Sequence, residues 1–177
     1  MDFSFTPEQE EFRQEVADFC QRELKAGRRD PGRIEAFRRK IAEKGWTGLS
    51  IPREYGGQGR DATFRVIFME EMAYWQAPVT LYDYGVTISL LGNICLRHGT
   101  EEQKREYLPR IARGEIFCGQ GYSEPQAGND LTRVQTRAVR RGDHYVINGQ
   151  KMWVHDARTY QYTLLLSLIH ISEPTRP

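Results

Sequence analysis

The chain has 177 residues, 39% of them hydrophobic, which suffices for one ordinary domain or for a helical unit followed by a small β unit. Its 25 Lys and Arg residues against 24 Asp and Glu residues leave a net charge of +1. That balance gives no reason to expect nucleic acid or an anionic membrane as a partner.

The cysteines and histidines show no pattern of a metal site. Cys20, Cys95 and Cys118 lie far apart and form no Cys-x-x-Cys motif, so we expect neither a disulfide framework nor a zinc site. The histidines are scattered, without metal-ligand spacing to carboxylates or cysteines. The N-terminus has no signal-peptide pattern, and no apolar run reaches the length of a membrane span. We therefore expect a cytoplasmic protein without a metal ion.

The first helices are predicted from their capping signals. Thr6 to Gln9 reads as a helix start, with Thr6 as the N-cap and Gln9 closing a capping box. Asp30 and the proline after it predict the start of a second helix, which we expect to stop at Gly45.

Residues 45 to 60 are rich in glycine and contain a formal match to the dinucleotide-binding fingerprint at Gly57, Gly59 and Ala62. That fingerprint requires a strand before the first glycine and a βαβ unit after it, whereas only helical patterns follow here. We therefore predict a loop between helices.

Asp61 predicts the N-cap of a third helix, with Glu70 and Glu71 on its solvated edge, because adjacent helical residues do not point at one target. A fourth helical run, residues 82 to 97, is apolar nearly all round, which indicates a central buried helix.

A second capping box at Thr100 starts the fifth predicted helix, which Pro109 is expected to kink or split and which ends near Gly114. From residue 116 the period becomes that of strands, so we place a domain boundary near residue 115. The predicted strands span 116 to 122, 133 to 140, 144 to 148 and 150 to 154.

Asn148 and Gly149 form the strongest short-range signal for a type I′ hairpin turn, which would carry Trp153 outward on a rigid strand. Upstream, residues 118 to 130 read CGQGYSEPQAGND, with glycines that permit close backbone approach and with interleaved polar groups. This composition suits a loop around a planar polar ligand. The alternative is that Trp153 is an ordinary strand residue and the glycines only make turns.

The motifs SEPQAGND and GQKMWV, about twenty residues apart, resemble the flavin-binding segment of acyl-CoA dehydrogenases. GLSIPREYGGQG and GTEEQKREYLPRIARGE also resemble that family, so the resemblance spans most of residues 3 to 166. Carried over residue by residue, it implies FAD binding by Gln120, Tyr122, Ser123, Gly128, Asn129, Trp153 and His155, with Asn129 also facing the substrate.

The resemblance implies an α+β fold, with an N-terminal all-α helical domain at residues 1–115 and an incomplete antiparallel β-barrel-like domain at residues 116–166. Residues 167–177 resemble the translation of a DNA-library adapter, and we expect them to be non-native. The family's C-terminal helical bundle would lie outside this chain.

The implied function is that of a fragment of an FAD-dependent acyl-CoA dehydrogenase, which oxidises the α,β C–C bond of an acyl-CoA thioester to the 2,3-enoyl-CoA. Its implied partners are acyl-CoA, an electron-transfer flavoprotein and further subunits in a homo- or hetero-oligomer. The family's general base is a Glu of the missing domain, so we assign no catalytic residue here and expect the chain itself to be inactive.

Two positions depart from the family pattern. His155 stands where the family usually has Thr or Ser, and Asn129 stands where it usually has Ser or Thr. His155 keeps open the alternative of a non-catalytic partner subunit with a structural role in a heteromeric dehydrogenase.

Overall fold

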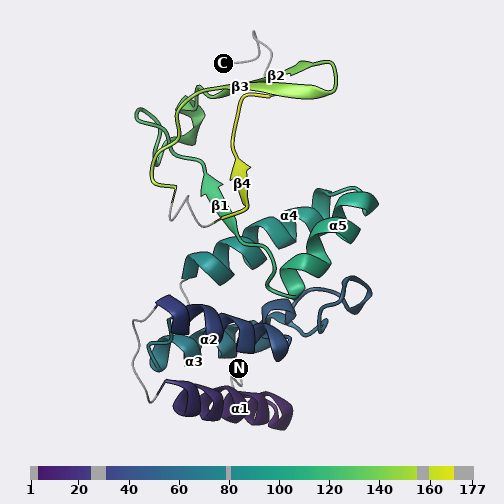
Figure 1. Ribbon diagram of the computed structural model, residues 1–177, viewed down its shortest axis with the longest axis vertical. Helices are drawn as coiled ribbons and strands as arrows, with labels where there is room; N and C mark the ends of the chain where they lie inside the picture. Colours follow the sequence, from purple (N-terminus) through teal and green to yellow (C-terminus); the bar gives the residue numbers. More distant parts are fainter. Residues whose placement is uncertain (1–3, 25–30, 79–80, 155–159, 170–177) are drawn as a thin grey trace. The chain divides into compact units, whose positions relative to one another are not determined.

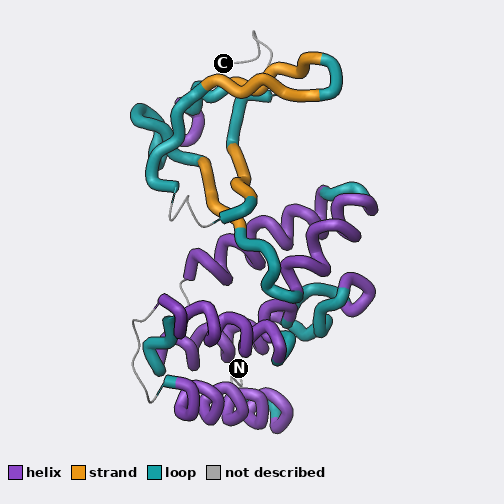
Figure 2. The backbone as a smooth tube through the Cα atoms, viewed as in Figure 1, coloured by secondary structure: helices purple, strands orange, loops and turns teal. Residues whose placement is uncertain are grey.

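The computed structural model describes residues 4–24, 31–78, 81–154 and 160–169, and the chain divides into two compact units, Met1–Phe117 and Cys118–Pro177. The first unit is built from helices, and the second holds short strands joined by long loops (Figures 1 and 2). The predicted α+β fold class is confirmed, and the described strands form no closed barrel.

Both predicted capping boxes are present. Helix α1 (Pro7–Glu23) begins where the Gln9 amide donates to Thr6 Oγ1 over 3.3 Å, while the Thr6 amide donates to Gln9 Oε1 over 2.9 Å. Helix α5 (Glu101–Ala112) begins with the same reciprocal pair. These bonds satisfy amides that the first helical turn leaves without partners. Helix α5 continues through Pro109 as one element and is not split.

The remaining helical elements of the helical unit keep the predicted order, with two 3₁₀ turns between the second and third helices. They are α2 (Pro31–Glu43), the short 3₁₀ turns η1 (Trp46–Gly48) and η2 (Arg53–Tyr55), α3 (Ala62–Tyr74), the π-helix η3 (Leu81–Gly92) and α4 (Asn93–His98). The sheet unit contains the 3₁₀ turn η4 (Leu131–Arg133). Helices α4 and α5 lie side by side (Figure 1). As predicted, Asp61 caps α3 by accepting from the Thr63 amide over 2.7 Å.

The fourth helical run differs from its prediction in geometry and burial. It is a π-helix before it becomes α4, a change of winding that hydrophobic spacing cannot reveal. Ile88 is buried, but Leu90 and Leu91 are only half-buried, so this run is less buried than the central helix that was expected. The described elements of the helical unit therefore cover only part of the apolar surface of this run.

Glycine-rich residues 45 to 60 form a loop between helices, as predicted, with 3₁₀ turns and no strand. At Gly57 a Cβ would lie 2.1 Å from the Ile51 carbonyl oxygen, so only glycine lets the chain fold back on itself here.

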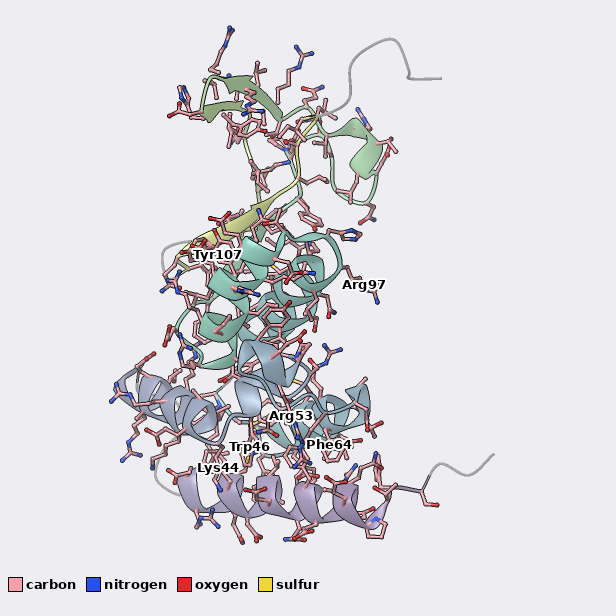
Figure 3. The ribbon with its side chains drawn as sticks, turned by 90° about the vertical axis from the view of Figure 1, so that its right-hand side faces the viewer. Lys44, Trp46, Arg53, Phe64, Arg97 and Tyr107 are labelled. Carbon is pink, nitrogen blue, oxygen red and sulfur yellow. The ribbon has the colours of Figure 1, made fainter. Side chains whose placement is uncertain are left out.

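Trp46 is the centre of the helical core, and its ring contacts three phenylalanine rings. The centroid distances are 5.0 Å to Phe19, 5.9 Å to Phe12 and 5.9 Å to Phe68, with edge-on geometry. Aromatic side chains bury large apolar areas and prefer such edge-to-face pairs. Figure 3 shows Trp46 and Phe64 close to α1, which packs against α3.

Glu71 does not lie on a solvated edge. It is 9% exposed, and its Oε1 lies 3.3 Å from Nη1 of Arg13, while Glu70 Oε2 lies 2.7 Å from Nη2 of the same guanidinium. The prediction for Glu71 was therefore wrong, because packing of α1 on α3 brings a cation to this edge.

In the second unit, β1 (Cys118–Gly121) pairs in parallel with β4 (Tyr162–Leu165), and β2 (Arg137–Arg141) pairs antiparallel with β3 (His144–Asn148). The antiparallel expectation holds for the second pair, which turns at Gly142 with φ +64. The parallel pair was not expected, because its strands lie far apart in the sequence.

The predicted hairpin at Asn148 and Gly149 is wrong, and no strand is described over residues 149–154. A Cβ at Gly149 would lie 2.2 Å from Thr136 Oγ1, so this glycine serves close approach to another segment and not a type I′ turn. Trp153 therefore lies on irregular backbone, at φ 58, and not on a strand.

Candidate functional site

The two motif segments meet in the sheet unit. The Met152 amide donates a 2.9 Å hydrogen bond to the Ser123 carbonyl oxygen. Trp153 is the next residue after Met152, so this bond joins the backbones that carry the predicted Ser123 and Trp153 side chains. Beyond Ser123 the loop turns tightly, with reciprocal bonds of 2.7 and 3.0 Å between the backbones of Glu124 and Ala127.

Trp153 is exposed and has a disfavoured backbone conformation. Its side chain is 83% exposed, and its φ of 58 lies in the left-handed region. An isolated bulky residue in that region is disfavoured by roughly 1–2 kcal/mol, and such strain concentrates at functional sites. The exposed indole face can stack on a planar ring.

A buried ion pair joins the two motif segments. Lys151 Nζ is 2.7 Å from Glu124 Oε1, and the two side chains are 9% and 2% exposed. The Glu124 carboxylate also accepts the Gln135 amide over 2.7 Å and the Thr136 amide over 2.9 Å. The predicted site residues did not include either member of this pair, although Glu124 belongs to the motif SEPQAGND and Lys151 to the motif GQKMWV.

The electrostatics of Glu124 follow from these partners. Burial alone would raise the pKa of its carboxyl group, but the hydrogen bonds from Lys151, Thr136 and the Gln135 amide outweigh burial. The net result is a pKa well below the ordinary value, so the carboxylate stays ionised. Burial also raises the pKa of Tyr122, with a smaller contribution from Cys118.

The other predicted residues are placed as follows. Gln120 is half-buried in β1, and Gly128 and Asn129 lie exposed past the Glu124–Ala127 turn. Added bulk at Gly128 would meet no atom within 4 Å, so an open surface surrounds it. His155 lies outside the described residues.

The helical unit contains a cavity of about 580 Å³ that the sequence did not reveal. Its walls are mostly apolar and come from the segment at 46–50, α3 with the residues after it, and η3; they include Leu49, Val66, Met69, Ala77, Tyr84 and Ile88. Thr47, which also lines it, is 1% exposed, and its Oγ1 has no hydrogen-bond partner among the described residues. Because these segments are distant in the chain, only the tertiary structure assembles the cavity.

Within the described ranges, no group of three His, Cys, Asp or Glu residues is arranged to hold a metal ion. No helix in the described part of the chain is both long and apolar enough to cross a membrane.

Two family descriptions match the chain in succession. "Acyl-CoA dehydrogenase, N-terminal domain" matches residues 6–115, and "Acyl-CoA dehydrogenase, middle domain" matches residues 119–175. The chain belongs to the acyl-CoA dehydrogenase family. Members of this family are flavoprotein oxidoreductases of fatty acid metabolism, so the resemblance seen in the motifs is confirmed.

Individual acyl-CoA dehydrogenases are similar over nearly the whole chain. Acyl-CoA dehydrogenase FadE26 of Mycobacterium tuberculosis is 43% identical over 164 residues, covering 86% of this chain and 40% of the relative. The ChsE4-ChsE5 complex from the same organism contains a chain with a TM-score of 0.83 and 41% identity, covering 93% of this chain and 43% of that one. A glutaryl-CoA dehydrogenase from Mycobacterium smegmatis, in complex with FADH2, has a TM-score of 0.78 and 25% identity, covering 92% and 43%. This chain thus spans less than half the length of the relatives it matches.

Proposed function

We propose that the chain is the N-terminal part of an FAD-dependent acyl-CoA dehydrogenase that oxidises the α,β C–C bond of an acyl-CoA thioester to the 2,3-enoyl-CoA. The observation that carries this proposal is the exposed, backbone-strained Trp153, joined to the Ser123 segment by the Met152 amide. An indole face beside a hydroxyl and turn amides fits an isoalloxazine ring, which is planar and polar at its edge.

The chemistry that FAD supplies when bound is acceptance of the hydride from the β carbon. Trp153 would cover one face of the ring and exclude water from it. The Ser123 hydroxyl would donate a hydrogen bond to the ring edge, where negative charge develops. Gln120, Tyr122, Gly128, Asn129 and His155 complete the proposed flavin site, and Asn129 would also face the thioester.

The mostly apolar walls of the cavity in the helical unit suit burial of methylene groups, each worth about 0.8 kcal/mol, which is compatible with an acyl substrate. No residue of the chain is proposed as the general base that removes the α proton, and we assign that role to a Glu of the C-terminal helical domain of the full-length enzyme.

We propose acyl-CoA as the substrate, an electron-transfer flavoprotein as the electron acceptor, and a homo- or hetero-oligomeric assembly. A second function is a non-catalytic partner subunit with a structural role. It is favoured by His155 in place of Thr or Ser, and by the similarity to a chain of the ChsE4-ChsE5 complex, which contains two different proteins.

Recovering from the source genome the full reading frame that encodes residues 1–166, and purifying its product, tests both functions. The dehydrogenase is expected to be yellow and to reduce an artificial electron acceptor when acyl-CoA is added, with Trp153→Ala lowering the FAD content. A colourless product that assembles with a yellow partner would support the structural subunit. A frame that continues without a C-terminal helical unit would contradict the dehydrogenase proposal.

A further inference from the structure

The ion pair between Glu124 and Lys151 is buried but well satisfied. Its 2.7 Å separation is accompanied by hydrogen bonds to Glu124 from the Thr136 hydroxyl, the Gln126 amide nitrogen at 2.7 Å and two backbone amides. A buried pair contributes to structure only when such additional bonds satisfy both charges, and removing one partner leaves the other charge buried without compensation. This network meets that condition.

The network joins three segments that strand pairing leaves apart. Lys151 Nζ donates to the Tyr122 carbonyl oxygen over 3.0 Å, while Glu124 accepts the amides of Gln135 and Thr136. The described strand pairs involve residues 118–121 with 162–165 and 137–141 with 144–148, and so include none of these positions. The polar network and the bond from Met152 to Ser123 therefore tie these three segments together, and the Leu168 amide adds a 2.8 Å bond to the Thr136 carbonyl oxygen.

Ser123 lies between two residues of the network, and Trp153 follows two residues after Lys151. We propose that the Glu124–Lys151 pair is a positioning element that fixes Ser123 and Trp153 relative to each other, so that both side chains can contact one planar ligand. The identity of that ligand as a flavin rests on the proposed function. The pair acts through these two residues and has no chemical step of its own.

The pair also restrains the chain that leads into Trp153, whose φ of 58 lies in the disfavoured left-handed region. Residues 151 and 152 are held by side-chain and backbone bonds to the Ser123 segment, so the backbone that enters Trp153 is fixed before any ligand binds. Such preorganisation reduces the ordering cost of binding.

The test uses the 177-residue chain with Glu124→Gln, Lys151→Met and the double variant. The matched control is Asp143→Asn, which alters an exposed pair of the same unit, where Asp143 Oδ1 lies 3.0 Å from His144 Nδ1. The fluorescence anisotropy of Trp153 is measured as the difference between each protein and its Trp153→Phe counterpart. Amide hydrogen exchange is followed at Met152 and, for reference, in α5.

Both single variants are expected to lower the Trp153 anisotropy and to accelerate Met152 exchange by about tenfold, as loss of local protection does, without changing exchange in α5. Lys151→Arg is expected to restore the wild-type anisotropy, and Asp143→Asn to leave it unchanged. The double variant is expected to cost less than the sum of the single changes, because no uncompensated charge remains.

Unchanged Trp153 anisotropy in both single variants would overturn the proposal, and so would equal acceleration of exchange in α5, which indicates global unfolding. If Lys151→Met does not fold, Thr136→Val removes only the hydroxyl bond to Glu124 and should produce a smaller loosening in the same direction. Failure of the flavin assignment is separable from this result. In that case the full-length protein would bind no FAD, although the variants would still loosen Trp153 as expected.

Discussion

Gly149 lies directly against Thr136, and a Cβ on Gly149 would be 2.2 Å from Thr136 Oγ1 and 2.7 Å from its Cα. Because the nearby Cα cannot move without the backbone, we expect Gly149→Ala to destabilise the sheet unit by about 2 kcal/mol. Hydrogen exchange of Thr136 and Met152 should accelerate, while that of the helical unit should not. Gly128→Ala is the control, since nothing lies within 4 Å of an added Cβ there. A neutral Gly149→Ala would show that the two segments separate easily.

The stability of the sheet unit should depend on acid through Glu124. Its pKa in the folded protein lies well below the ordinary value near 4.3, so the unfolded state binds the proton more tightly. The stabilisation by this carboxylate is therefore fully present above about pH 4.3 and is lost as the pH falls towards the folded pKa. Urea unfolding of the unit from pH 7 to pH 3 measures this effect.

In Glu124→Gln, the same acid dependence should be weaker, and stability at pH 7 should be lower by about 3 kcal/mol. Asp143→Asn provides the comparison, because that carboxylate is exposed. Equal acid sensitivity of wild type and Glu124→Gln would assign the effect to other groups.

Cys20 should be unreactive in the folded protein. Burial, with a smaller contribution from the Glu71 charge, raises the pKa of its thiol to about 12, and the side chain is 0% exposed. Since the thiolate is the reactive form, a maleimide at pH 8 should leave Cys20 unmodified for hours and label it rapidly in denaturant. Mass spectrometry of the peptides identifies the modified residue. Fast labelling of native Cys20 would mean that α1 separates from α3 at Met72, whose Sδ lies 3.8 Å from the thiol.

We expect the dissociation constant for FAD and the chain alone to lie above the micromolar range. The residues proposed to contact FAD lie on the ring side, and a ligand of this size needs most of its surface enclosed for tight binding. In a titration that follows tryptophan fluorescence, we expect little quenching at micromolar FAD and no dehydrogenase activity. Micromolar or tighter binding that disappears in Trp153→Ala would show that this part of the site is sufficient by itself.

The sequence alone predicted the features that depend on residues near each other in the chain. The capping boxes at Thr6 and Thr100 and the cap at Asp61 were found from spacings of two or three residues, because the stabilising bonds join those same residues. The motifs at 118–130 and 149–154 indicated the family because each is a continuous run of residues that can be read directly from the sequence.

Only the tertiary structure decided which segments meet. Asn148 and Gly149 have the local signal of a hairpin, yet contact with Thr136 determines the conformation of that glycine. The Glu124–Lys151 pair and the cavity joining η1, α3 and η3 bring together residues distant in sequence. Buried charges and cavity walls gain their energy from partners that no local pattern specifies, so the sequence determined the helices and the motifs, and three-dimensional packing determined the site.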